Sequence, residues 1–229
     1  HRWLACPGSV ALVATAGAPA TGSASADEGT AAHEMAERIL LGADGILLIG
    51  QHAKNGWRFT ADMLEQVSKY VTLVRDLVAS TNGVLYVEQR VPIDHLTDEL
   101  GATGTADCVI DAGDELIVVD LKYGRGVQVE AEDNPQMVMY ASGVLRRMRE
   151  ADEMIGLERP PFKQVRMIIA QPRLGHFPEW ALPMATVDGA LGFDFWESSI
   201  AAAARSCGDE NAPLLPSERR DRLSGHCTR

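Results

Sequence analysis

The amino-acid sequence predicts an α/β domain built around one mixed β-sheet. Apolar residues recur at helical spacing in the first third of the chain and again after residue 134. Residues 84–122 instead alternate or run apolar between turn residues, as strands do. Another apolar run at 164–170 follows the second helical region, so helices and strands are interspersed. We expect the order helix, three strands, helix, strand, in a single domain over residues 1–229 with a polar tail from about residue 206.

Four segments have the apolar period of amphipathic helices. The first has acidic residues before it and Gly42 after it, and the third begins with Asn134 as N-cap and Pro135 in its first turn. The predicted helices are residues 30–41, 61–80, 134–148 and 187–205. Outside them we expect a short helix or turn at 2–12, a flexible loop at 17–25, an irregular exposed segment at 45–56 and a polar tail without period at 213–229.

The strand signals lie mainly in the middle of the chain. Residues 84–91 alternate and are closed by Pro92. Residues 102–110 and 115–122 are joined by the turn at 111–114, which predicts a β-hairpin. Residues 164–170 and 180–183 are the remaining predicted strands.

Composition argues against some classes of function but does not identify the function. The chain is 46% hydrophobic, as globular proteins are, and has no apolar run of the roughly 18 residues that a membrane span needs. Its net charge of −11 argues against binding nucleic acid over the whole surface but leaves room for a local basic groove. The four cysteines are widely scattered, which favours a reducing cytoplasm over a disulfide scaffold. We therefore expect a cytoplasmic protein that does not insert into membranes.

The strand at residues 115–122 ends in a pair of opposite charges. The apolar run Leu116–Val119 is followed by Asp120, Leu121 and Lys122, and then by two glycines. Side chains two residues apart on a strand share a face, so Asp120 and Lys122 should emerge together where the strand leaves the core. The carboxylate can hold a hard divalent cation, and the lysine can orient or activate a water beside it. The alternative for the pair, considered alone, is a strand-end salt bridge.

Asp107 lies on the strand that the hairpin pairs with the Asp120 strand. Two carboxylates a few ångströms apart repel strongly unless a cation lies between them. Phosphate-ester cleavage is the chemistry that most often uses such a cation. The alternative for Asp107 is that it caps a turn.

Two predicted helices carry further polar candidates. His33 has the small neighbours Ala32 and Ala36, which would let its helix approach the sheet; the alternative is a packed or surface histidine. Glu34 and Glu37 are secondary candidates on the same helix. Gln136 and Tyr140 are four residues apart and share a helix face, where they could bind phosphate or position the lysine, or form an ordinary half-buried face.

Taken together, these residues resemble the PD-(D/E)XK nuclease superfamily. The resemblance is to its RecB-like branch of RecB-type nuclease domains, CRISPR-associated RecB-like exonucleases and phage exonucleases of the lambda type. The matching motifs are GTAAHE with His33, GTADCVI with Asp107, VDLKYG with Asp120 and Lys122, and QMVMY with Gln136 and Tyr140. The stretches RWLACPGS and EGTAAHE are most similar to a phage- and prophage-encoded subfamily. The resemblance implies a restriction-endonuclease-like core.

The resemblance also implies a role for each matching residue. His33, Asp107, Asp120 and the backbone carbonyl of Leu121 would ligate Mg²⁺ or Mn²⁺. Asp107, Asp120 and Lys122 would be catalytic, with Lys122 positioning or deprotonating the attacking water. Gln136 and Tyr140 would hold DNA near the metal. One imidazole in an oxygen-rich ligand set makes Mn²⁺ as suitable as Mg²⁺.

Two features depart from the pattern of these relatives. Many of them hold a 4Fe–4S cluster with four cysteines, for which Cys6 and Cys227 would be candidates here. Only Cys207 joins them, without a C-x-x-C pair, and Cys108 is better placed in the core, so we do not expect an intact cluster. The chain is also acidic. Its candidate DNA-facing basic residues, each equally consistent with a solvated charged face, are Arg125, Arg146, Arg147, Arg149, Lys163, Arg166 and Arg173.

The expected function is a metal-dependent DNA exonuclease that hydrolyses phosphodiester bonds at DNA ends in phage-type recombination or DNA processing, in a bacterium or phage-infected host cell. By the same resemblance, its partners would be DNA and a phage single-strand annealing protein, and homo-oligomerisation stays open. The alternatives are an endonuclease or CRISPR-adaptation-like nuclease, and a catalytically idle relative that binds DNA or protein. The intact His33/Asp107/Asp120/Lys122 set argues against the idle relative.

Overall fold

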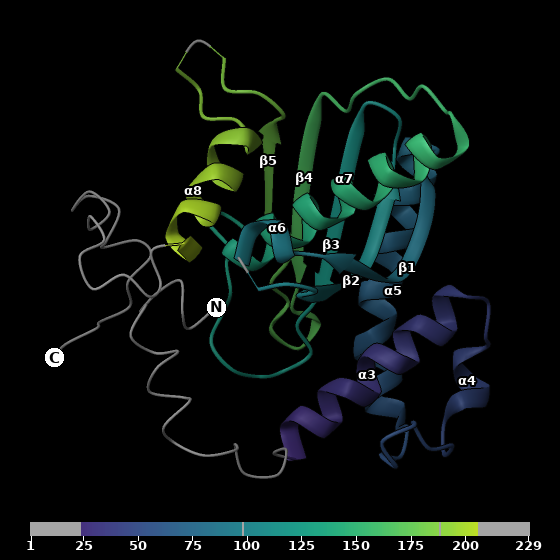
Figure 1. Cartoon of the computed structure of the whole chain (residues 1–229). Coiled ribbons are helices and arrows are strands. Elements are labelled where there is room, and N and C mark those ends of the chain that lie inside the picture. The colour runs from purple at the N-terminus through teal and green to yellow at the C-terminus, as the bar shows by residue number, and fades with distance from the viewer. Residues whose placement is uncertain (1–23, 98, 188, 206–229) are drawn as a thin grey trace, which may run out of the picture.

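The computed structural model describes residues 24–97, 99–187 and 189–205. Within them, one five-stranded mixed β-sheet lies between two groups of helices (Figure 1). The predicted α/β class with a single mixed sheet is confirmed, and the arrangement is consistent with a restriction-endonuclease-like core. The segments expected at 2–12 and 213–229, and nearly all of the loop expected at 17–25, lie outside the described residues.

From one edge of the sheet to the other, the strands lie in the order in which they occur in the chain. Neighbouring strands are antiparallel except β3 and β4, which are parallel because helix α7 crosses between them. The strands are β1 (Val84–Pro92), β2 (Thr103–Asp111), β3 (Glu115–Leu121), β4 (Gln164–Ala170) and β5 (Glu179–Pro183). The predicted hairpin is the β2–β3 pair, and the sequence placed β4 at its observed bounds.

Strand β3 is the centre of the core, and all its residues are buried. Ile117, Val119 and Leu121 pack in the hydrophobic cluster that contains α3 (Ala24–Leu40) and α5 (Ala61–Thr81). Leu116 and Val118 pack in the opposite cluster. This alternation follows from the period of two along a strand, and it explains why β3 shows a continuous apolar run.

Helices α3 and α5 cover one face of the sheet, and α5 is capped by the Thr60 side chain. The segment at 45–56 is mostly exposed, as expected, but it is not irregular throughout. It contains the short helix α4 (Gly45–Leu48), and both Leu48 and Ala53 are buried. Apolar side chains in the segment anchor it to the core.

The other face is covered by α6 (Asp94–Thr97), α7 (Pro135–Ile155) and α8 (Phe193–Arg205). Asn134 caps α7 as expected, but the helix continues to Ile155 rather than ending at 148. The predicted end followed the loss of apolar period, whereas Gly156, at φ 68°, makes the actual C-cap. Among the described helices, none combines the length and the apolar character needed to cross a bilayer.

Helix α8 begins at Phe193, later than the predicted start at 187. The preceding residues form a turn in which Thr186 donates to the Asp194 carboxylate. Gly192 fits closely there, since a Cβ at this position would lie 2.3 Å from the Ala185 carbonyl carbon. The turn therefore replaces the first turns of the predicted helix. A short 3₁₀ helix, η1 (Pro172–Leu174), follows β4 and was not predicted either.

Candidate metal and hydrolytic site

Asp107 lies where the β2–β3 ladder opens. The ladder runs from Asp111 and Leu116 to Cys108 and Val119, and the next residues along it are Asp107 and Asp120. The amide of Leu121 instead donates to the Asp107 side chain, at 2.7 Å from Oδ2. The carboxylate thus replaces a backbone acceptor between the strands, and it is held against the end of β3.

His33 reaches this carboxylate from helix α3. Its Nδ1 lies 3.1 Å from Asp107 Oδ1. Ala32 and Ala36 are buried beside it, so the expectation that small residues let the helix approach the sheet is confirmed. Glu34 faces elsewhere: it binds the Arg38 guanidinium at 2.5 Å and accepts from the Lys54 amide at 2.7 Å.

Asp120 and Lys122 meet as the strand spacing predicts, with Lys122 Nζ 2.8 Å from Asp120 Oδ2. Gln136 of α7 joins the pair. Its Oε1 accepts from Lys122 at 2.8 Å, and its Nε2 donates to Asp120 Oδ1 at 3.1 Å and to the Tyr140 hydroxyl at 3.0 Å. Gln136 and Tyr140 therefore share one helix face, and of the two roles foreseen for them the contacts favour positioning the lysine.

The Tyr140 ring lies against strand β2 at Gly104. A Cβ at Gly104 would stand 2.6 Å from Tyr140 Cε1. Only glycine leaves room for the ring at this position. Gly104 therefore contributes to the orientation of the hydroxyl that Gln136 contacts.

Glu88 is a member of the site that the sequence reasoning missed. Single ligand atoms of His33, Glu88 and Asp107 all lie within 4.8 Å of one another. The signal was present in the sequence, since Glu88 is a carboxylate in a predicted strand that neighbours the Asp107 strand. We call His33, Glu88, Asp107, Asp120 and Lys122 the charged cluster.

The charges in the cluster perturb one another. Burial and then the charge of Asp107 raise the pKa of Glu88 from 4.5 to about 7. The same two causes raise the pKa of Asp120, against the opposing effect of Lys122. Burial lowers the pKa of His33, but the hydrogen bond and charge of Asp107, with the charges of Asp120 and Glu88, outweigh burial and raise it. The cluster carries more negative charge than its own cations neutralise.

This arrangement suits a divalent cation. Asp120 is 2% exposed, and its Oδ2 is paired with the Lys122 ammonium, whose Nζ lies 2.8 Å away. Buried carboxylate oxygens together with one imidazole form a donor set typical of Mg²⁺ and Mn²⁺ sites. His33, Glu88 and Asp107 are the described side chains whose ligand atoms converge closely enough to hold an ion, and Asp120 is not in that group.

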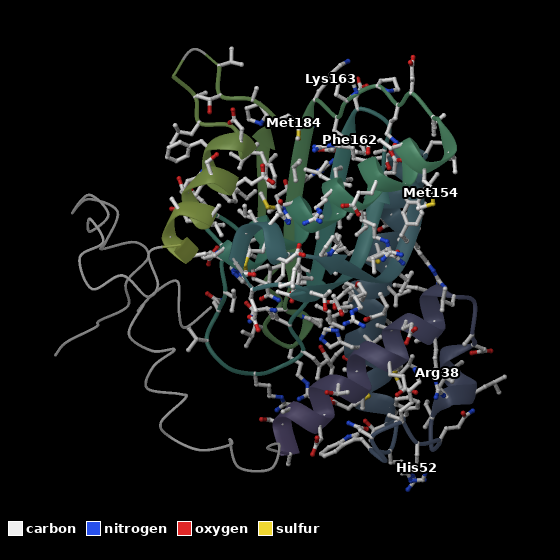
Figure 2. All side chains as sticks on the ribbon, viewed as in Figure 1. Arg38, His52, Met154, Phe162, Lys163 and Met184 are labelled. Carbon is white, nitrogen blue, oxygen red and sulfur yellow. The ribbon has the colours of Figure 1, made fainter. Side chains whose placement is uncertain are left out.

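The predicted basic residues are not gathered at the cluster. Arg125 is exposed on the loop after β3. Arg146 contacts Asp94 at 2.6 Å and Glu150 at 2.8 Å. Several others also have partners within the chain: Arg147 with the Arg90 carbonyl, Lys163 with Asp114, Arg166 with Glu115, and Arg173 with Glu28 and Asp62. Figure 2 shows Lys163 at the end of the molecule opposite Arg38 of α3.

The cysteine predictions are tested only in part. Cys108 is fully buried, as expected for a core residue, and burial raises its pKa to about 12. Cys6, Cys207 and Cys227 lie outside the described residues.

The fold and the charged cluster define a mixed α/β protein with a candidate divalent-cation site at the ends of its central strands. The chain belongs to the family described as "Protein of unknown function (DUF2800)", whose model matches residues 1–218. It is also similar to a solved structure titled "Crystal structure of SSO0001", with 11% identity and a TM-score of 0.30 over 93% of this chain and 88% of that chain.

Proposed function

We propose that this protein is a divalent-cation-dependent deoxyribonuclease that hydrolyses phosphodiester bonds at DNA ends. One observation carries the proposal. His33 Nδ1 lies 3.1 Å from Asp107, Asp107 accepts from the Leu121 amide at 2.7 Å, and Lys122 lies 2.8 Å from Asp120, so side chains from α3, from β2 and from the end of β3 meet at one end of the sheet. A lysine beside buried, mutually repelling carboxylates is suited to phosphate-ester chemistry.

The proposed cation ligands are His33, Asp107, Asp120 and the backbone carbonyl of Leu121. A divalent cation held there would lower the pKa of a bound water and polarise the scissile P–O bond. The convergence of His33 and Asp107 with Glu88, and the raised pKa values of Glu88 and Asp120, support a cation beside these carboxylates.

Lys122 supplies the positive charge that the protein itself brings to the reaction. Asp120 and Gln136 hold its ammonium from two sides, so it does not have to be ordered when the substrate arrives. From this position Lys122 would orient the attacking water and stabilise charge on the phosphate. Gln136 fixes both the lysine and the Tyr140 hydroxyl, which would then lie near the DNA backbone.

The choice of DNA as substrate, and of DNA ends in particular, rests on the resemblance of the motifs to RecB-like and phage exonucleases. The same resemblance supports a role in phage-type recombination beside a strand-annealing protein. The acidic net charge of −11 indicates that any DNA contact is confined to a limited surface. Arg125, which is exposed on the loop after Lys122, is the basic residue that we place at that surface.

The test is digestion of linear duplexes labelled at the 5′ or 3′ end, beside a closed circle, with Mg²⁺ or Mn²⁺. An exonuclease should shorten the linear DNA from one labelled end and leave the circle intact. Lys122→Met should abolish cleavage while DNA binding persists, and Lys163→Met, which removes the lysine that precedes β4 and pairs with Asp114, should cleave like wild type. Cleavage of the circle would identify the endonuclease alternative. DNA binding without cleavage under all conditions would identify the idle relative and overturn the proposal.

A further inference from the structure

The outer edge of β1 has no strand partner among the residues that the structure describes. β1 lies at one margin of the sheet and pairs with β2 alone. A free strand edge presents unpaired backbone N–H and C=O groups, which another strand can bind, and proteins usually protect it with charges, proline or an irregular residue. The regular part of β1 from Val84 to Val87 contains neither charge nor proline, and Glu88, at φ 49°, interrupts the strand only after it.

The opposite edge of the sheet is protected in the usual ways. β5 has five residues, begins with Glu179 and ends with Pro183. The start of α8 is bound beside it, since the Asp194 amide donates to the Met184 carbonyl. Of the two edges, β1 is therefore the one that offers an uncharged segment for pairing.

The exposed side chains at the β1 edge are apolar. Leu85 and Val87 pack against the cluster that contains α3 and α5. Val84 and Tyr86 alternate with them and so face the side of the sheet that α7 covers. Val84 is 56% exposed and Tyr86 is 38% exposed.

The C-terminal end of α7 adds apolar surface on the same side. Arg159 binds both Asp152 of α7 and Asp111, which lies opposite Val84 in the β1–β2 ladder. These ion pairs hold that end of the helix near the start of β1. Figure 2 shows Met154 on the side of the molecule where Figure 1 draws β1. The exposed apolar residues at this end of α7 are Met154, Ile155 and Leu157, at 85%, 74% and 50% exposed.

We propose that β1 of one copy of the chain pairs antiparallel with β1 of a second copy, about a two-fold axis that passes through Leu85 perpendicular to the sheet. Opposite residues in an antiparallel pair face the same side. Pairing centred on Leu85 places Val84 of one copy opposite Tyr86 of the other, and the symmetry repeats this contact. Each contact joins a β-branched and an aromatic side chain, a combination that stabilises antiparallel strands.

The pattern of residues favours a second copy over an unrelated strand. Two exposed apolar residues two positions apart are complementary to themselves under this symmetry, as an interface between identical subunits requires. Gly83 would lie opposite Val87, so no like charges meet within the paired segment although each chain has a net charge of −11. A pairing centred on Tyr86 would instead require the irregular residue Glu88 to pair.

Dimerisation would bring the two charged clusters close together. Glu88 is three positions from Leu85, so the two Glu88 residues would lie roughly 20 Å apart along the strands. An axis perpendicular to the sheet keeps α3 and α5 of both copies on one face. The clusters would then lie on the same side of the dimer, whether or not they hydrolyse DNA.

The association is tested by sedimentation velocity of the full chain over a range of concentrations. Wild type should sediment with twice the mass of one chain. Tyr86→Lys should raise the dissociation constant roughly tenfold or more, because the symmetric contact loses both cross-strand pairs at once. Leu100→Lys is the matched control, since it replaces a leucine that is 98% exposed on the loop before β2, and it should dimerise like wild type. Circular dichroism establishes that each variant is folded.

The register is tested by cross-linking at Leu85. Leu85→Cys, in a chain whose Cys6, Cys207 and Cys227 are replaced by serine, should form a disulfide-linked dimer on mild oxidation. Directly opposed residues of antiparallel strands have Cα atoms about 4.5–5.5 Å apart, within the range that a disulfide spans. Cys108 is fully buried and should not react.

Each result supports or overturns the β1 pairing. A monomer at every concentration would overturn it. A dimer that persists in Tyr86→Lys, or that gives no cross-link at position 85, would use another surface and would also overturn it. A wild-type dimer with this register that cleaves no DNA would refute the proposed nuclease and leave the pairing intact, and a monomer that cleaves DNA would do the reverse.

Discussion

Replacing Glu88 with glutamine should raise the stability of the cation-free protein at pH 8. Burial and the charge of Asp107 raise the pKa of Glu88 from 4.5 to about 7, and Glu37 acts in the same direction. His33 and Lys54 act in the opposite direction, but they do not compensate. Glutamine keeps the size of the side chain and removes the charge that destabilises the folded state.

The size of the effect follows from the pKa of Glu88. A change from 4.5 to about 7 corresponds to roughly 3 kcal/mol between the two protonation states. Because Glu88 is only partly buried, solvent screens the charge, and we take about half of this value, ~1.5 kcal/mol. For a chain of this length, ~1.5 kcal/mol raises Tm by roughly 3–6 °C.

The direction in which folding stability changes with pH can be measured. The folded protein keeps the Glu88 proton to about pH 7, whereas the unfolded chain releases it near 4.5. Wild type therefore loses stability as pH rises between these values, and the loss is complete above pH 7. In EDTA, wild type and Glu88→Gln should have the same Tm near pH 4 and differ at pH 8. A variant with a lower Tm than wild type at pH 8 would refute the argument that the carboxylates are crowded.

Three other results are expected. Gly104→Ala should displace the Tyr140 ring, destabilise the protein by ~1–3 kcal/mol in chemical denaturation and reduce DNA cleavage, whereas Tyr140→Phe should keep the stability. Ser142→Ala should reduce stability by ~1–3 kcal/mol with Mn²⁺ binding unchanged, because His95 and Glu197 lose a shared hydrogen-bond partner in the α7–α8 contact. EDTA should abolish cleavage of linear DNA, Mg²⁺ or Mn²⁺ should restore it, and Ca²⁺ should support binding alone; cleavage that persists in EDTA would contradict the proposed cation dependence.

The sequence predicted those parts of the fold that depend on local patterns. The apolar run Gln164–Ala170 and the hairpin around residues 111–114 were found because their apolar residues and turn residues are contiguous. Helix α7 was predicted too short because its last turns are charged and only Gly156 marks the end. The start of α8 was predicted too early because the turn at Thr186 depends on a side-chain contact with Asp194.

The part of the candidate site that depends on strand geometry was predicted from the sequence. Two-residue spacing places Lys122 beside Asp120, and the hairpin brings Asp107 to the same end of β3. Glu88 was missed because regular alternation along β1 does not predict a residue in the left-handed region, where Glu88 lies with a φ of 49°. The partners of Arg146, which are Asp94 and Glu150, likewise depend partly on a helix that the sequence did not indicate.

The turn between β2 and β3 lies at the far end of the hairpin from the charged cluster. Gly113 is exposed there, and Ala112 is five positions along the chain from Asp107, which corresponds to roughly 17 Å of strand. A fluorophore or surface tether attached at this turn would therefore lie away from the charged cluster. Immobilised single molecules could then be watched on stretched DNA, which would count the nucleotides removed in each encounter.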